Sequence, residues 1–225
     1  MRIGIIAEGF TDITIIKAIL KTTKGIDGSE IIPIRPKEHT DETDLSASNF
    51  SNWTLVLQEC QNEQTFENFF DIIDEKSFLV IQIDAAEHGE AGYDIPNPRR
   101  EKDTDWKIYS KQLYIQIKSK IENLIPIPYQ QYVKYAITIE ETDAWLIPLF
   151  ENIKDDTARY ANPKEHLQKL IGTLKGKEKQ KYINTNKKSL DYSMIAKGLK
   201  KGLNICRKKN VSLDIFCISI EELPD

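Results

Sequence analysis

The sequence predicts an α/β fold in which a mainly parallel β-sheet is flanked by helices and followed by a C-terminal helical addition. Short apolar runs of strand length alternate with segments of helical periodicity, which is the order typical of a doubly wound domain. The run at residues 78–83 is strongly apolar, as expected for a strand buried on both faces. Several of these runs end in acidic residues, and the carboxyl ends of the strands are where such folds keep their chemistry.

The first strand and the first helix are expected at residues 3–7 and 11–20. Thr11 is a suitable N-cap, and apolar residues recur behind it at helical spacing. The second strand is expected at residues 31–34. Because Pro33 cannot donate a hydrogen bond to a neighbouring strand, we expect this strand to be short and to lie at an edge of the sheet.

The middle of the chain is expected to hold the central strand and a long loop. Residues 37–49 are polar and predict a loop, whereas residues 50–73 carry one or two helices. The third strand, at residues 78–83, is expected at the centre of the sheet. It leads into a connection of about twenty residues, which is long for a compact domain and typical of a functional or disordered segment. A helix at residues 106–124 then ends before Pro126.

A fourth strand is expected at residues 132–139 and a further helix at residues 142–150. Together with the preceding elements they complete an α/β domain, which we assign to residues 1–150.

Residues 151–225 are expected to form a basic helical addition. Asn162 followed by Pro163 is a typical helix start, with proline at the first helical position. Residues 190–207 predict an amphipathic helix with an apolar side and a lysine-rich side. The apolar residues 213–218 predict a final strand that rejoins the sheet.

Composition excludes several classes of protein. The chain has 225 residues, and no apolar run approaches the roughly 20 residues that span a bilayer. No signal peptide is recognisable, so we expect a soluble, cytoplasmic protein that does not bind a membrane. The cysteines are odd in number and widely spaced, which fits buried thiols rather than disulfides or a zinc site. The histidines are expected at the surface. These residues are Cys60, Cys206, Cys217, His39, His88 and His166.

The charges are distributed unevenly along the chain. Residues 175–209 contain twelve Lys or Arg and two acidic residues, so this stretch carries +10 and the remainder carries −14 of the net −4. This separation suits a basic surface for phosphate beside an acidic body. A solvated lysine-rich helix that aids solubility explains the same pattern equally well.

Acidic residues follow three of the expected strands. Glu8 closes the first strand, Asp84 the third, and residues 140–143 (Glu-Glu-Thr-Asp) the fourth. Carboxylate oxygens on neighbouring strand ends are ligands that Mg²⁺ prefers, and a bound metal can neutralise charge on a phosphodiester. A single acid after a strand often only caps the next helix. Three such positions together favour a metal site.

Two motifs resemble the Toprim fold of topoisomerases, primases and OLD-type nucleases. Residues 7–12 (Ala-Glu-Gly-Phe-Thr-Asp) follow the first strand, and residues 140–146 (Glu-Glu-Thr-Asp-Ala-Trp-Leu) are similar to the signature of small RloB-like Toprim proteins found near restriction and phage-defence loci. The likeness covers roughly residues 1–150. It implies a Rossmann-like sheet, a general acid/base role or metal-positioning role for Glu8, and magnesium binding by Asp84.

The chain departs from the Toprim pattern at the third strand. The family usually shows Asp-x-Asp, whereas Asp84 is followed by Ala-Ala-Glu, so the second carboxylate has to come from another acid. We expect Glu8, Asp84 and Glu141 to carry the reaction. The metal ligands, for Mg²⁺ or Mn²⁺, are expected among Glu8, Asp84, Glu87, Glu140, Glu141 and Asp143.

The expected activity is that of a divalent-metal-dependent nuclease acting on DNA or RNA, as a toxic effector in phage defence. Basic residues are expected to hold the phosphates: Arg99, Arg100, Lys164, Lys197, Lys200 and Lys201. Two alternatives remain open. One is a non-catalytic Toprim-like subunit that binds a partner ATPase, and the other is a metal-dependent enzyme that acts on small nucleotides. Assembly into a homo-oligomer also remains open.

Overall fold

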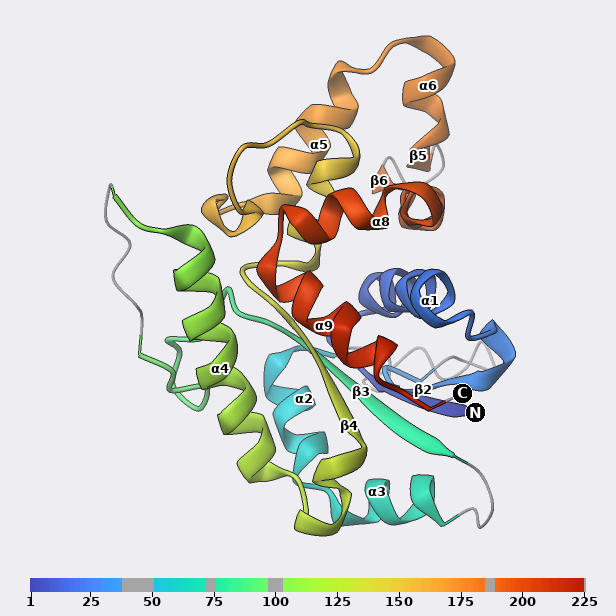
Figure 1. Cartoon of the computed structure of the whole chain (residues 1–225), viewed down its shortest axis with the longest axis vertical. Coiled ribbons are helices and arrows are strands. Elements are labelled where there is room, and N and C mark those ends of the chain that lie inside the picture. Colours follow the sequence, from blue (N-terminus) through green and yellow to red (C-terminus); the bar gives the residue numbers. More distant parts are fainter. Residues whose placement is uncertain (38–50, 72–75, 97–102, 185–188, 225) are drawn as a thin grey trace.

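The computed structural model describes residues 1–37, 51–71, 76–96, 103–184 and 189–224. Its centre is a four-stranded parallel sheet in the order β2-β1-β3-β4, flanked by helices (Figure 1). The strands are β1 (Arg2–Ile6), β2 (Ile31–Arg35), β3 (Ser77–Asp84) and β4 (Val133–Thr138). The predicted α/β class, the parallel sheet and the Rossmann-like layout are therefore confirmed.

The strand order follows from the apolar content of each strand. The apolar residues of β3 are almost all buried, and β3 lies between β1 and β4, as the sequence predicts. The proline-containing β2 lies at one edge, also as predicted. Since all four strands are parallel, the acids that follow β1, β3 and β4 lie at one edge of the sheet.

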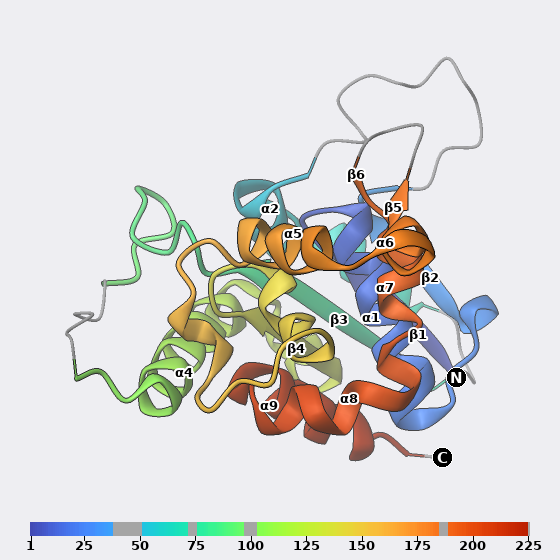
Figure 2. The same cartoon turned by 90° about the horizontal axis from the view of Figure 1, so that it is seen from above.

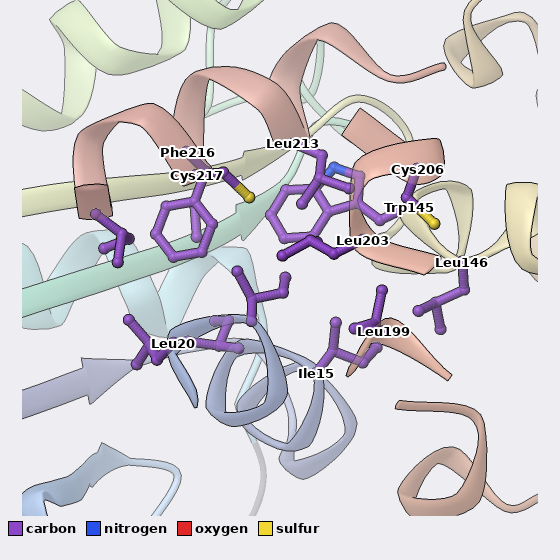
Figure 3. Packing of buried hydrophobic residues seen from close by; sticks show 14 of the residues in the cluster. Ile15, Leu20, Trp145, Leu146, Leu199, Leu203, Cys206, Leu213, Phe216 and Cys217 are labelled. Carbon is purple, nitrogen blue, oxygen red and sulfur yellow. The ribbon is translucent and has the colours of Figure 1, made fainter. Parts of the chain in front are cut away.

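One face of the sheet is covered by α1 (Phe10–Lys24) together with helices from the C-terminal third of the chain. These are α7 (Tyr192–Ala196), α8 (Leu199–Lys208) and α9 (Val211–Glu221). Figure 3 shows Trp145 packed among Leu203, Leu213 and Phe216, with Ile15 of α1 on the opposite side of this cluster. Residues before and after position 150 thus share one hydrophobic core.

The other face is covered by α2 (Trp53–Cys60), α3 (Glu63–Phe70) and α4 (Trp106–Leu124). One or two helices were predicted before β3 and there are two, and the predicted bounds of α4 are confirmed. Helices α5 (Pro163–Thr173) and α6 (Gly176–Lys181) lie beyond the carboxyl ends of the strands, at the top of Figure 1, and Figure 2 shows them from above. Asn162 and Pro163 begin α5 as predicted.

The remaining elements are short. A two-stranded antiparallel ribbon is formed by β5 (Ile183–Asn184) and β6 (Ser189–Leu190). Turns of 3₁₀ helix occur at Gly28–Glu30, Ile127–Tyr132, Thr142–Trp145, Ile147–Leu149 and Thr157–Arg159.

The predicted final strand is wrong, because residues 213–218 belong to helix α9. Asn210 caps this helix: its side chain accepts a hydrogen bond from the backbone N–H of Leu213 at 2.9 Å. The buried residues recur at intervals of three and four, and a short apolar run by itself does not distinguish a strand from such a helix. They are Leu213, Phe216, Cys217 and Ile220.

Three other predicted elements differ in detail. The helix expected at residues 142–150 is two turns of 3₁₀ helix, since Pro148 lacks an N–H and disfavours the α conformation of the residue before it. The amphipathic helix expected at residues 190–207 is divided into α7 and α8. The first helix begins at Phe10 with Gly9 as its N-cap, so the assignment of Thr11 as N-cap is wrong. All three cysteines are buried free thiols, as predicted.

Candidate functional site

The acids that follow β1 and β3 are in direct contact. The backbone N–H of Asp84 donates a hydrogen bond to Oε1 of Glu8 at 2.6 Å. The backbone N–H of Glu8 in turn donates to the side-chain oxygen of Gln82 at 2.9 Å. Adjacent parallel strands therefore hold Glu8 and Asp84 together through two hydrogen bonds that cross from one strand end to the other.

The carboxylate of Asp84 is fixed through one of its two oxygens. Oδ1 accepts from the amide of Gln82 at 2.8 Å and from the hydroxyl of Thr142 at 3.3 Å. It also accepts a short hydrogen bond from the hydroxyl of Thr138. Within the described chain no hydrogen bond engages Oδ2. One oxygen orients the carboxylate, and the other remains available to a ligand.

Gln82 was not among the predicted site residues. Its side chain has no exposed surface, and besides its bonds to Glu8 and Asp84 its amide reaches the hydroxyl of Thr142 at 3.3 Å. A polar amide in an otherwise apolar strand is the signal that could have indicated this role, because a buried polar group requires hydrogen-bond partners.

Burial and mutual repulsion perturb both carboxyl groups. Burial raises the pKa of Glu8 to about 8, the negative charges of Asp12 and Glu87 add to that rise, and the N–H groups of Asp84 and Trp53 oppose it. Burial, followed by the charges of Asp12 and Glu8, likewise raises the pKa of Asp84 well above its ordinary value. Such perturbation of neighbouring acids is typical of functional sites.

Asp12, in the first turn of α1, is a second residue that the prediction omitted. Burial and the charge of Asp143 raise its pKa to about 6, while the neighbouring hydroxyl of Thr142, which is also within hydrogen-bond distance of Asp84, opposes the rise. A Cβ atom at Gly9 would lie 3.1 Å from Oδ2 of Asp12, so glycine leaves room for this carboxylate. The sequence signal was the position: Asp12 lies in the first turn of the helix that follows Glu8 and Gly9.

The acids that follow β4 complete the cluster. Oδ1 of Asp143 accepts a hydrogen bond from the hydroxyl of Tyr192 at 2.6 Å. Burial raises the pKa of Asp143 to about 6, and the positive charge of Lys164 lowers it. Oε2 of Glu141 accepts from the backbone N–H of Lys164 at 3.1 Å. Tyr192 comes from α7, far along the chain, and no local pattern pointed to it.

Two further predicted ligands occupy different surroundings. Glu87 lies in the turn after β3, where burial, followed by the charges of Glu90 and Glu141, raises its pKa. Glu140 is buried and has a φ of 71°, a left-handed conformation that is uncommon for residues other than glycine. Its carbonyl accepts from the N–H of Ala85 at 3.1 Å, which ties the end of β4 to the end of β3.

We call Glu8, Asp12, Asp84, Glu87, Glu141 and Asp143 the acid cluster. Their charges influence one another's pKa across three strand ends and α1. The predicted convergence of acids at one sheet edge is therefore present.

The described part of the loop after β3, residues 85–96, packs against the site. Tyr93 is buried, stacks on Trp53 with ring centroids 5.3 Å apart, and donates its hydroxyl to the carbonyl of Asp84 at 3.0 Å. Tyr93 therefore supports the end of β3. His88 is buried with its Nδ1 3.1 Å from the carbonyl of Ile95, so its expected surface position is wrong.

The predicted phosphate-binding residues are dispersed. Lys164 is exposed at the start of α5, beside Glu141 and Asp143. Lys200 and Lys201 line a cavity of about 260 Å³ with Thr22 and Thr23, ten residues or more beyond Asp12 and so about 15 Å further along α1. The two lysines are therefore not beside the acid cluster.

The other predicted phosphate-binding residues are Lys197, Arg99 and Arg100. Lys197 is exposed, with its amino group 3.3 Å from the sulfur of Met194. Arg99 and Arg100 lie outside the described residues.

The donor chemistry of the acid cluster suits a hard divalent cation, because all its ligating atoms are oxygens. In the described part of the chain, no group of three or more His, Cys, Asp or Glu side chains stands in an arrangement that could hold a metal ion. Mg²⁺ usually keeps several waters and takes only one or two carboxylates plus substrate phosphate. Asp84 and Glu8 supply two neighbouring carboxylates, which is the number that such a site takes from the protein.

Comparison with models of known protein families, with curated proteins and with solved structures found no match to this chain. The chemistry that we assign to the acid cluster is therefore argued from the positions and environments of its residues and not from a similar protein. Within the described residues, no helix combines the length and apolar character needed to cross a membrane.

Proposed function

We propose that this protein is a Mg²⁺- or Mn²⁺-dependent nuclease that hydrolyses phosphodiester bonds at the acid cluster. The observation that carries the proposal is the contact of Glu8 with Asp84, which stand 76 residues apart in sequence, beside the acids that follow β4. Glu8 and Asp84 both have raised pKa values. A cluster of mutually repelling, partly buried carboxylates is costly unless it takes up protons or binds a cation, and a divalent cation can replace those protons.

Each residue has a distinct part in this proposal. Asp84, oriented by Gln82 and Thr138, offers Oδ2 to the metal. Glu8, held by the N–H of Asp84, is the group for proton transfer to the leaving oxygen, or a second ligand. A bound Mg²⁺ supplies charge neutralisation at the phosphate and an activated water.

The residues around these two complete the proposed machinery. Glu141 and Asp143 add further carboxylates, and Lys164, which lies beside both of them, is the proposed phosphate-binding residue among those that the structure describes. The resemblance of residues 7–12 and 140–146 to Toprim proteins supports the same assignment, including a place among phage-defence effectors.

An enzyme that acts on small nucleotides is a second candidate. Among the predicted basic residues that the structure describes, only Lys164 lies beside the acid cluster, and this favours the second candidate, because a polymer binds through several phosphate contacts. The length of the substrate distinguishes a nuclease from an enzyme that acts on small nucleotides. A nuclease cleaves polymers, whereas the alternative acts on mononucleotides and leaves polymers intact.

The test is a cleavage assay on plasmid DNA, single-stranded DNA, total RNA and nucleoside phosphates, with Mg²⁺ or Mn²⁺. Glu8→Gln and Asp84→Asn are compared with wild type and with two exposed acids, Glu165→Gln and Asp103→Asn, as matched controls. We expect both site variants to lose about a hundredfold or more of the activity and both controls to keep it. A folded, metal-supplied wild type that cleaves nothing would contradict the proposal, as would active site variants.

A further inference from the structure

A cavity lies along the edge strand β2, where α3 and the end of α2 face it. Its volume of about 740 Å³ falls within the range of small-molecule sites, about 300–1,000 Å³. It is distinct from the acid cluster. Glu8 faces Trp53 at the start of α2, whereas the cavity meets α2 at Glu59, near its end, about 9 Å further along the helix.

The cavity is lined by more positive than negative charge. Arg2, Arg35 and Lys37 contribute cations, and Glu59 is the only acid among the described lining residues. The net charge of this lining is +2, in a protein whose overall charge is −4. The local field therefore favours an anion.

The two arginines are held in place without using all their donors. Arg2 donates from Nη1 to the carbonyl of Phe69 at 2.7 Å and lies 4.6 Å from the centre of that ring. Arg35 donates from Nε to Glu59 at 3.0 Å. In the described residues no partner engages Nη2 of Arg2 or either terminal nitrogen of Arg35. A fixed guanidinium with spare N–H groups matches the oxygens of a phosphate.

Amides on α3 provide a different kind of contact. Nε2 of Gln64 donates to Oδ1 of Asn68 at 2.9 Å, which leaves the Gln64 oxygen as an acceptor and the Asn68 nitrogen as a donor. One donor and one acceptor side by side are what the hydrogen-bonding edge of a nucleobase requires. Ile32, Pro33 and Ile34 add an apolar wall suited to a ring face.

We propose that the cavity along β2 binds a nucleoside monophosphate. Its phosphate lies against Arg2, Arg35 and Lys37, and its base meets Gln64 and Asn68. Binding requires no divalent cation, because the cations are supplied by the protein. This site is independent of the reaction proposed at the acid cluster.

The test is calorimetric titration of the full chain in EDTA with AMP, GMP, CMP and UMP, and with inorganic phosphate and citrate as probes of the anion alone. Lys37→Glu and Arg35→Gln are the site variants. Lys111→Glu, an exposed lysine of α4, is the matched control, and Asp84→Asn reports on the acid cluster. Because Lys37 is exposed, its replacement leaves the fold intact even if Arg35→Gln loosens the contact with Glu59.

We expect at least one nucleoside monophosphate to bind, and Lys37→Glu and Arg35→Gln to weaken it about tenfold or more. Lys111→Glu and Asp84→Asn are expected to bind as wild type does. Four results would overturn the proposal: no binding of any nucleotide, equal binding by Lys37→Glu, loss of binding in Asp84→Asn, or binding of phosphate or citrate as tight as that of the nucleotides. Since no metal and no turnover are involved, these outcomes do not depend on the nuclease proposal.

Discussion

The backbone N–H of Asp84 donates to the carboxylate of Glu8 at 2.6 Å, and this one contact joins the carboxyl ends of two neighbouring strands. It brings two carboxyl groups together inside a partly buried cluster. The pKa of both groups is raised, chiefly by burial, so the arrangement stores unfavourable electrostatic free energy that a bound cation would relieve.

Gln82 is predicted to hold this pair in position. Gln82→Leu leaves the N–H of Glu8 without its acceptor and Oδ1 of Asp84 without one of its donors. We expect the free energy of unfolding to fall by about 1–3 kcal/mol, which urea denaturation measures. Gln112→Leu, at an exposed position of α4, is the matched control. Equal stability of the two variants would show that the network contributes nothing.

Stability is predicted to decrease as the pH rises in the absence of metal. Glu8 has a pKa of about 8, and Asp12 and Asp143 have pKa values of about 6, all above their ordinary values of 4.5 and 3.8. Between those limits the folded chain holds more protons than the unfolded chain, so unfolding becomes easier as pH rises from about 4 to about 8. Thermal denaturation in EDTA across this range measures the effect.

Glu8→Gln is predicted to remove part of that pH dependence. The variant should be more stable than wild type at pH 8.5, with the melting temperature rising by about 2–4 °C per kcal/mol, and the difference should shrink towards pH 5. Glu165→Gln, which changes an exposed acid, should show no such gain. A variant less stable than wild type at pH 8.5 would contradict the repulsion inferred for the cluster.

The hydroxyl of Tyr192 is predicted to lower the pKa of Asp143. Tyr192→Phe removes the donor to Oδ1 of Asp143, and loss of that hydrogen bond should raise the pKa of Asp143 further. The expected cost is about 1 kcal/mol of stability and a shift of the activity profile to higher pH. Tyr160→Phe removes a matched tyrosine–carboxylate contact, to Glu151, on the surface. If the pH profile of the activity were unchanged in Tyr192→Phe, the inferred effect of Tyr192 on Asp143 would be contradicted.

Helix α9 makes the clearest test of the fold. Asn210 caps it, bonding to the N–H of Leu213 at 2.9 Å, whereas Asn162 at the start of α5 makes no side-chain cap. Asn210→Ala is therefore expected to cost about 1–2 kcal/mol in urea denaturation, and Asn162→Ala almost nothing. Equal costs would argue against α9 as the structure shows it.

The sequence was most informative where local signals act alone. Helix α4 begins after Asp105, whose side chain caps it, and ends ahead of Pro126, and its bounds were predicted correctly. The order of β1, β3 and β4 placed Glu8, Asp84 and Asp143 at one edge because parallel strands end together. Local patterns of this kind predict where a strand ends or where a helix begins and ends.

The remaining site residues depend on packing between distant segments. Gln82 was hidden in an apolar run, and Tyr192 reaches Asp143 only because α7 packs against α1. Residues 213–218 were read as a strand although their burial follows a helix that lies against β4. Each of these features depends on a contact between residues far apart in the sequence. The spacing of apolar residues along the chain does not predict such contacts.

The central claim is that the acid cluster holds a divalent cation through Asp84. Electron paramagnetic resonance of Mn²⁺ measures this directly, because the signal of the free ion falls when protein binds it. We predict that wild type and Asp103→Asn deplete the free signal, and that Asp84→Asn, equally folded by circular dichroism, does not. Depletion that is the same in Asp84→Asn, or absent from wild type, would contradict the assignment of a metal to this cluster.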